Sequence, residues 1–166
     1  MELLKGFPNR MKEVLENTDY LRVLQTDETM QITAMNIPHG GEIPKETHHG
    51  ITQMLLIVAG QATVVSSDPK VSGYAFTGDA VWVPPNTDHW VISGNSRSTK
   101  LPDGTYGEAM YTSHGPPLKL LSVYAPPEHP PDRLIKEYPG RYLPVVDEGH
   151  HRHSKEGDKL CVKMWL

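Results

Sequence analysis

Apolar residues in this chain gather in short runs that turn residues separate. Residues 30–37 partly alternate apolar and polar side chains, as a half-buried strand requires. Residues 53–58 are strongly apolar but too short for a typical helix. The 14 glycines and 15 prolines among the 166 residues punctuate these runs without forming a repeat. The pattern predicts many short strands.

The remaining runs extend this prediction to an all-β fold, either a closed barrel or a sandwich. Met11, Val14 and Leu15 have helical spacing, which predicts a short N-terminal helix over residues 9–17, with an extended arm as the alternative. Residues 134–138 are predicted to form one helical turn. Strands are predicted for residues 20–25, 30–37, 53–58, 61–66, 74–76, 80–83, 89–92, 109–111 and 118–124.

We expect three regions in a single domain of this length. They are an N-terminal arm or helix (1–19), a β-barrel (20–130) and a partly mobile C-terminal extension (131–166). Residues 93–107 are polar and rich in turn formers, which predicts a long loop or a lid over the barrel mouth.

The C-terminal extension is mostly polar. It contains a cluster of histidines, His150, His151 and His153, which we interpret as a tail because its surroundings are too polar for a preorganised site. The closing residues, 160–166, are apolar enough to dock on the barrel or on a second subunit.

Composition narrows the possible partners. The net charge is -4 and the lysines and arginines are scattered, which argues against a nucleic-acid partner. No apolar run approaches the roughly 20 residues that span a bilayer, and the N-terminus lacks the pattern of a signal peptide. Cys161 is the one cysteine, so an internal disulfide is excluded and a reducing compartment is expected. We therefore expect a cytoplasmic protein with no membrane or nucleic-acid partner.

Two stretches carry potential metal ligands beside glycines and prolines. Residues 40–60 read G-G-E-I-P-K-E-T-H-H-G-I-T-Q-M-L-L-I-V-A-G, and residues 78–89 read G-D-A-V-W-V-P-P-N-T-D-H. They resemble the two motifs of the cupin superfamily, G(X)5HXH(X)3,4E(X)6G and G(X)5PXG(X)2H(X)3N, over roughly residues 20–130. The resemblance implies a cupin jelly-roll β-barrel, also called a double-stranded β-helix.

The motifs can be aligned in two registers. Counting back from Gly60 places Glu46, His48 and Gln53 where the family has His, His and Glu. In the second motif, His89 occupies the ligand position and Asn86 replaces the family glycine.

The other register follows small single-domain cupins that read E-x-H-x-H-x-D-Q and later Y-A-P-P-E-H-P, as residues 124–130 do here. In that alignment Gly50 replaces the second histidine and Thr52 the aspartate. Both registers agree on His48, Gln53 and His89.

The resemblance implies a divalent transition metal, Fe, Mn, Ni, Co or Zn, bound by His48, Gln53 and His89. Imidazole suits these ions, and the neutral Gln53 binds less tightly than a glutamate unless Glu46 participates. Glu46 and His49 are the candidate catalytic acids or bases. His49 compensates for the missing second histidine only if a bulge turns it toward His48.

Three hypotheses follow for the function. The first is a metal-dependent isomerase, lyase or dioxygenase that acts on a small polar metabolite. Related cupins resemble mannose-6-phosphate isomerases, but no Lys/Arg cluster that would hold a phosphate accompanies the ligands here. The alternative is a non-catalytic, metal-free module that binds a small molecule. The third is a structural or partner-binding protein. A homodimer is expected under all three.

Overall fold

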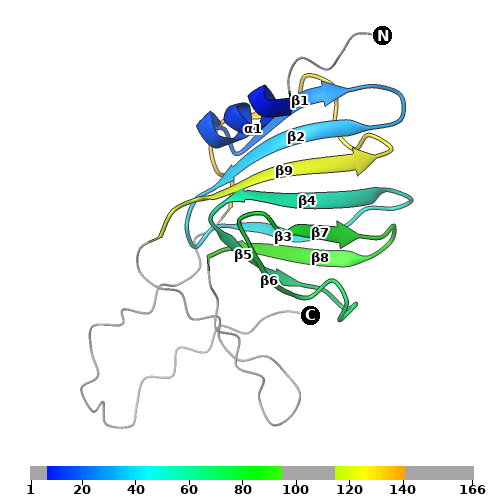
Figure 1. Cartoon of the computed structure of the whole chain (residues 1–166). Helices are drawn as coiled ribbons and strands as arrows, with labels where there is room; N and C mark the ends of the chain where they lie inside the picture. Colours follow the sequence, from blue (N-terminus) through cyan, green and yellow to red (C-terminus); the bar gives the residue numbers. More distant parts are fainter. Residues whose placement is uncertain (1–6, 95–114, 141–166) are drawn as a thin grey trace, which may run out of the picture.

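The computed structural model describes residues 7–94 and 115–140, which form two antiparallel sheets and one helix (Figure 1). The elements are α1 (Phe7–Glu16), β1 (Leu21–Thr26), β2 (Gln31–Ile37), β3 (Glu42–Thr47), β4 (Thr52–Ala59), β5 (Gln61–Val65), β6 (Gly73–Phe76), β7 (Ala80–Val83), β8 (Asp88–Ser93), β9 (Leu118–Ala125) and β10 (Leu134–Ile135). No helix in the described residues is long and apolar enough to span a membrane.

The strand order is that of a jelly roll, as the sequence predicts. One sheet runs β10-β1-β2-β9-β4-β7 and the other β3-β8-β5-β6, so strands distant in sequence lie side by side. The predicted closed barrel is wrong in one respect. No backbone hydrogen-bond ladder joins the two sheets in the described residues, and the fold is closed mainly by side-chain packing between them.

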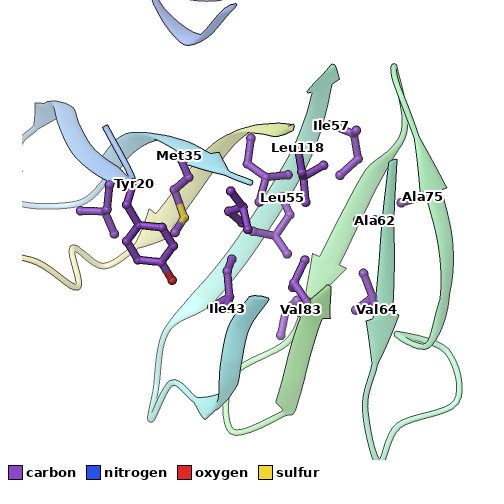
Figure 2. Packing of buried hydrophobic residues seen from close by; sticks show 14 of the residues in the cluster. Tyr20, Met35, Ile43, Leu55, Ile57, Ala62, Val64, Ala75, Val83 and Leu118 are labelled. Carbon is purple, nitrogen blue, oxygen red and sulfur yellow. The ribbon is translucent and has the colours of Figure 1, made fainter. Parts of the chain in front are cut away.

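The main hydrophobic core lies between the two sheets (Figure 2). Leu55 and Val83 from the larger sheet meet Ile43, Ala62 and Val64 from the smaller one. All five side chains are at least 96% buried. Burying such side chains is the main favourable contribution to folding, at about 1.5–3 kcal/mol for each large aliphatic one.

Helix α1 covers the outer face of the larger sheet, where Figure 1 shows it beside β1 and β2. Its Val14 is fully buried and packs with Ala34, Val58 and Leu121. These residues alternate along their strands with the ones that face the main core. The predicted N-terminal helix is therefore confirmed.

The structure corrects the sequence prediction at two places. The helical turn predicted for residues 134–138 is wrong, because Leu134 and Ile135 pair with Arg22 and Leu21 as strand β10. Strand β3 was not predicted, since Pro44 and its charged neighbours obscure the pattern. Proline is tolerated there because β3 is an edge strand.

Several predictions lie outside the described residues. They are the strand at 109–111, most of the loop or lid at 93–107, the histidine tail at 147–158 and the apolar C-terminus at 160–166.

We predict that Leu55→Ala lowers the free energy of unfolding by about 2–5 kcal/mol, because it leaves a cavity between the sheets. Urea denaturation at unchanged m-value measures this loss. Leu15→Ala is the matched control, since Leu15 is 50% exposed on α1, and it should cost less than about 0.5 kcal/mol. Equal losses in the two variants would contradict the placement of the core.

Candidate metal centre

Glu46 and His89 lie directly opposite each other on β3 and β8. The register slips between Ile43, which faces Val91, and Glu46, so β3 carries one residue more than β8 over this stretch. Residues three apart on a regular strand point to opposite faces. The bulge instead places Ile43 and Glu46 on the same inward face, a use of bulges that is common beside functional sites.

His48 lies just beyond β3, in a tight loop that meets the second motif. The backbone N–H of Asn86 donates to the carbonyl oxygen of His48 (2.9 Å), and the Asn86 Oδ1 accepts from the N–H of Gly50 (3.3 Å). Asn86 has φ 62°, the left-handed conformation that the family glycine would adopt. Asparagine tolerates this conformation better than most residues, so the departure from the motif preserves the loop.

The three side chains converge on one point. The Nε2 of His48 lies 3.2 Å from Glu46 Oε1, and the Nε2 of His89 lies 3.3 Å from the same oxygen. One donor atom from each residue lies within 4.8 Å of the others. His89 is fully buried and His48 is 7% exposed, so both imidazoles are shielded from bulk water.

The far side of each imidazole has its own oxygen partner. His89 Nδ1 lies 3.5 Å from the carbonyl oxygen of Thr87, and His48 Nδ1 lies 3.4 Å from Glu128 Oε1. A proton on each Nδ1 leaves both Nε2 lone pairs facing inward. Metal-binding histidines in proteins are usually oriented in this way.

The pKa values reflect this charge arrangement. Burial would raise the pKa of the Glu46 carboxyl, but His48 and His89 outweigh it and hold that pKa at about 2. For His48, burial opposes the charged form, yet Glu46 and Glu128 raise its pKa above the ordinary value. Glu46 is therefore held in its ionised form between the two imidazoles.

Glu46, His48 and His89 can hold a metal ion. Metal–ligand bonds of about 2.1 Å place neighbouring ligand atoms about 3.0–3.4 Å apart, which matches the separations of the two Nε2 atoms from Glu46 Oε1. His89 Nε2 is also buried without a hydrogen bond, because its approach to Glu46 is close but poorly directed. A nitrogen with an unused lone pair at this point fits a metal ligand.

Gln53 lies on the inner face of β4, opposite Tyr124 and Val83. Its side chain is fully buried, and neither amide atom has a hydrogen-bond partner in the described structure. The Tyr124 ring packs edge-on against His48, with centroids 5.5 Å apart, so the cross-strand neighbour of Gln53 contacts the centre. Its role as a ligand stays a prediction.

The inner face of the larger sheet changes from apolar to polar at this end. Met35, Leu120 and Ile57 form one apolar row across β2, β9 and β4. The next two rows toward the centre contain polar side chains, Thr33 beside Ser122, and then Gln31, Tyr124 and Gln53. The Thr33 hydroxyl is buried without a partner. Burial raises the pKa of the Tyr124 hydroxyl, and contacts of that hydroxyl with Gln53 and Ser122 partly offset the rise.

His49 does not join the three donors. It is exposed, and its Nδ1 lies 3.4 Å from Asn86 Oδ1, away from the centre. Its catalytic role, like that of Glu46, stays a prediction. Glu128 and His129, which the sequence analysis did not assign, lie close to the site. Both residues belong to the segment Y-A-P-P-E-H-P, which matches a segment of small single-domain cupins. The match alone indicates no chemical role for either residue.

Comparisons with known proteins support the fold. No family model matches the sequence. The chain is similar to the uncharacterised protein YrkC of Bacillus subtilis (30% identity, 69% of this chain and 54% of YrkC) and to protein L612 of Acanthamoeba polyphaga mimivirus (28%, 76% and 68%). It thus spans little more than half the length of YrkC. The crystal structure of BH2720 from Bacillus halodurans matches with a TM-score of 0.63 at 26% identity (80% of this chain, 89% of that one).

Solved structures named as RmlC-like cupins or cupin superfamily proteins also match, with TM-scores of 0.46 to 0.49. The strand order, the two motifs and the inward-facing histidines identify the same fold independently.

We predict that the metal-free protein is most stable between about pH 4.5 and 6.5. The pKa of Glu46, about 2 against an ordinary 4.5, adds stability above pH 4.5 that is lost as the pH falls toward 2. The raised pKa of His48 adds stability below pH 6.5 that is lost as the pH rises through its folded value, and the lowered pKa of His129 opposes this by destabilising the fold as the pH falls below 6.5. Urea midpoints from pH 3 to 9 measure this maximum.

Glu46→Gln should flatten the maximum, at a cost of about 1–2 kcal/mol after allowance for the partial exposure of Glu46. The exposed Glu28→Gln is the control and should keep the wild-type profile. A maximum that survives in Glu46→Gln would show that other groups cause it.

Proposed function

We propose that this cupin-fold domain binds one divalent transition metal and uses it to act on a small, uncharged polar metabolite. The observation that carries the proposal is the meeting of Glu46 Oε1 with two histidine Nε2 atoms, one of them buried without a hydrogen bond. Gln53 supplies the fourth ligand in this proposal through its buried, unpartnered amide oxygen. A mixed imidazole and carboxylate set suits Fe, Mn, Ni, Co or Zn.

The metal supplies Lewis acidity that polarises a bound substrate oxygen. The protein residues divide the other tasks. Glu46 balances positive charge at the centre, and Thr87 and Glu128 hold the two imidazoles in the ligand orientation. Burial lowers the pKa of His129, and its Nε2 is buried without a partner. His129 is therefore our candidate proton carrier for an isomerase or lyase reaction.

The polar rows beside the centre support an uncharged ligand. The buried polar groups of Thr33, Ser122 and Gln53 are neutral, and each costs about 1–3 kcal/mol where nothing satisfies it, as at the Thr33 hydroxyl. The neighbouring Lys45 forms an ion pair with Asp88, with its Nζ 2.9 Å from Asp88 Oδ2. A ligand that brings hydroxyl or carbonyl groups satisfies these atoms.

We predict that the purified protein binds about one equivalent of one of these metals, and that His89→Ala weakens binding more than about 100-fold because a buried ligand is lost. Dialysis against each metal followed by elemental analysis measures stoichiometry, and competition with a chelator measures affinity. His49→Ala should bind like the wild type, because His49 faces Asn86.

Wild-type protein that holds less than about 0.1 equivalent of every metal after reconstitution would contradict the metal centre and favour the metal-free binding module. Loss of binding in His49→Ala would instead mean that His49 replaces the missing motif histidine.

We predict that a neutral α-hydroxyketone, hydroxyacetone, binds the Co²⁺-loaded protein and perturbs its visible spectrum. Ser122→Ala and Thr33→Val should weaken hydroxyacetone binding about 2–10-fold each, the value of one neutral hydrogen bond. Their affinity for Co²⁺ alone should not change.

Thr63→Val provides the matched control, because Thr63 is buried on the other sheet and donates to the carbonyl oxygen of Gly94 (3.2 Å). Wild-type hydroxyacetone affinity in both Ser122→Ala and Thr33→Val would show that the polar rows do not contact the ligand.

A further inference from the structure

Gln31 joins two parts of the chain that are 98 residues apart. It is the first residue of β2, and its side chain is fully buried. Its Nε2 donates to the carbonyl oxygen of His129 (2.7 Å), and its Oε1 accepts from the backbone N–H of the same residue (2.9 Å). A side-chain amide that makes both bonds replaces the backbone partner that a neighbouring strand would provide.

The segment that Gln31 holds cannot be fixed by a regular ladder. It leaves β9 after Ala125 and contains Pro126, Pro127 and Pro130, none of which has a backbone N–H to donate. His129 offers both its N–H and its carbonyl oxygen to Gln31. Because prolines also restrict the backbone, fixing His129 fixes the adjacent Glu128.

Glu128 is the link to the centre. Its Oε1 lies 3.4 Å from His48 Nδ1, on the side of the ring opposite Glu46. A carboxylate there favours a proton on Nδ1, the tautomer that leaves the Nε2 lone pair free for a metal, and it competes with Glu46, whose Oε1 lies 3.2 Å from Nε2. Glu128 is exposed and could turn toward solvent if its backbone moved. Whether the Glu128 carboxylate stays near His48 Nδ1 therefore depends on the backbone position that Gln31 fixes at His129.

We propose that Gln31 is a positioning residue of the metal centre, acting on His48 through the His129 backbone and the Glu128 carboxylate. This inference rests on the proposed metal-binding function. It adds that a buried residue on β2, outside both motifs, sets the orientation of a ligand and hence the metal affinity. Loss of such an outer-shell partner typically lowers metal affinity 10–100-fold.

The first test is the tautomer of His48 in metal-free protein, read from ¹⁵N NMR at a pH where the ring is neutral. The wild type should show a measurable population with the proton on Nδ1, because Glu128 competes there with Glu46 at Nε2. Gln31→Leu and Glu128→Ala should both reduce that population in favour of the tautomer with the proton on Nε2. Gln61→Leu, the same change at the first residue of β5, is the matched control and should keep the wild-type tautomer.

The second test is Zn²⁺ affinity by competition with a chelator. Gln31→Leu and Glu128→Ala should each weaken binding about 10–100-fold, and the double variant should be no weaker than Glu128→Ala alone, because both act along one path. Glu128→Gln retains an oxygen acceptor and should restore most of the affinity. Additive losses in the double variant would show that Gln31 acts independently of Glu128.

The outcomes separate this inference from the proposed function. If the wild type binds no metal, the proposed function fails, while the tautomer experiment on metal-free protein still decides the role of Gln31. If Gln31→Leu keeps the wild-type tautomer and affinity, the positioning role is overturned. Should Gln31→Leu fail to fold, Gln31→Glu serves instead, because a carboxylate accepts from His129 N–H but cannot donate to its carbonyl oxygen.

Discussion

The centre depends on the pairing of Glu46 with His89 across β3 and β8. That pairing needs one extra residue in β3, because regular alternation would place Ile43 and Glu46 on opposite faces. Ile43 is buried in the core and lies opposite Val91 on β8. The bulge lets the same short strand contribute to the core at one end and supply a carboxylate to the site at the other.

The position of the site follows from where the apolar rows end. The row of Met35, Leu120 and Ile57 packs like any core, but the next two rows bury hydroxyls and amides. Burying such groups is unfavourable unless they find partners. The Gln31 amide finds its partners in the His129 backbone, whereas the Thr33 hydroxyl has none among the described residues. Polar side chains thus replace part of the core at this end of the sandwich.

The sequence was sufficient to predict the jelly roll, because short apolar runs and two motifs with fixed spacing report the strands directly. It also identified His48 and His89, which the structure brings together. It could not predict how Glu46 is directed, since a bulge leaves no signature in E-I-P-K-E-T. Nor could it assign Gln31 or Glu128, whose roles depend on contacts between residues about 80 to 100 positions apart. Residue type alone does not reveal such contacts.

The departures from the family motif compensate one another. The family pattern places a neutral histidine at position 46 and a carboxylate at position 53. This chain instead has the carboxylate, Glu46, at the first position and the neutral Gln53 at the second. Either set of four positions contains one carboxylate, so the net charge offered to a cation is the same. The position of the carboxylate differs, because it lies on β3 rather than β4. Its oxygen there is close to the Nε2 atoms of both imidazoles. The replaced histidine therefore moves the negative charge to Glu46, in a group of three side chains that could hold a metal ion.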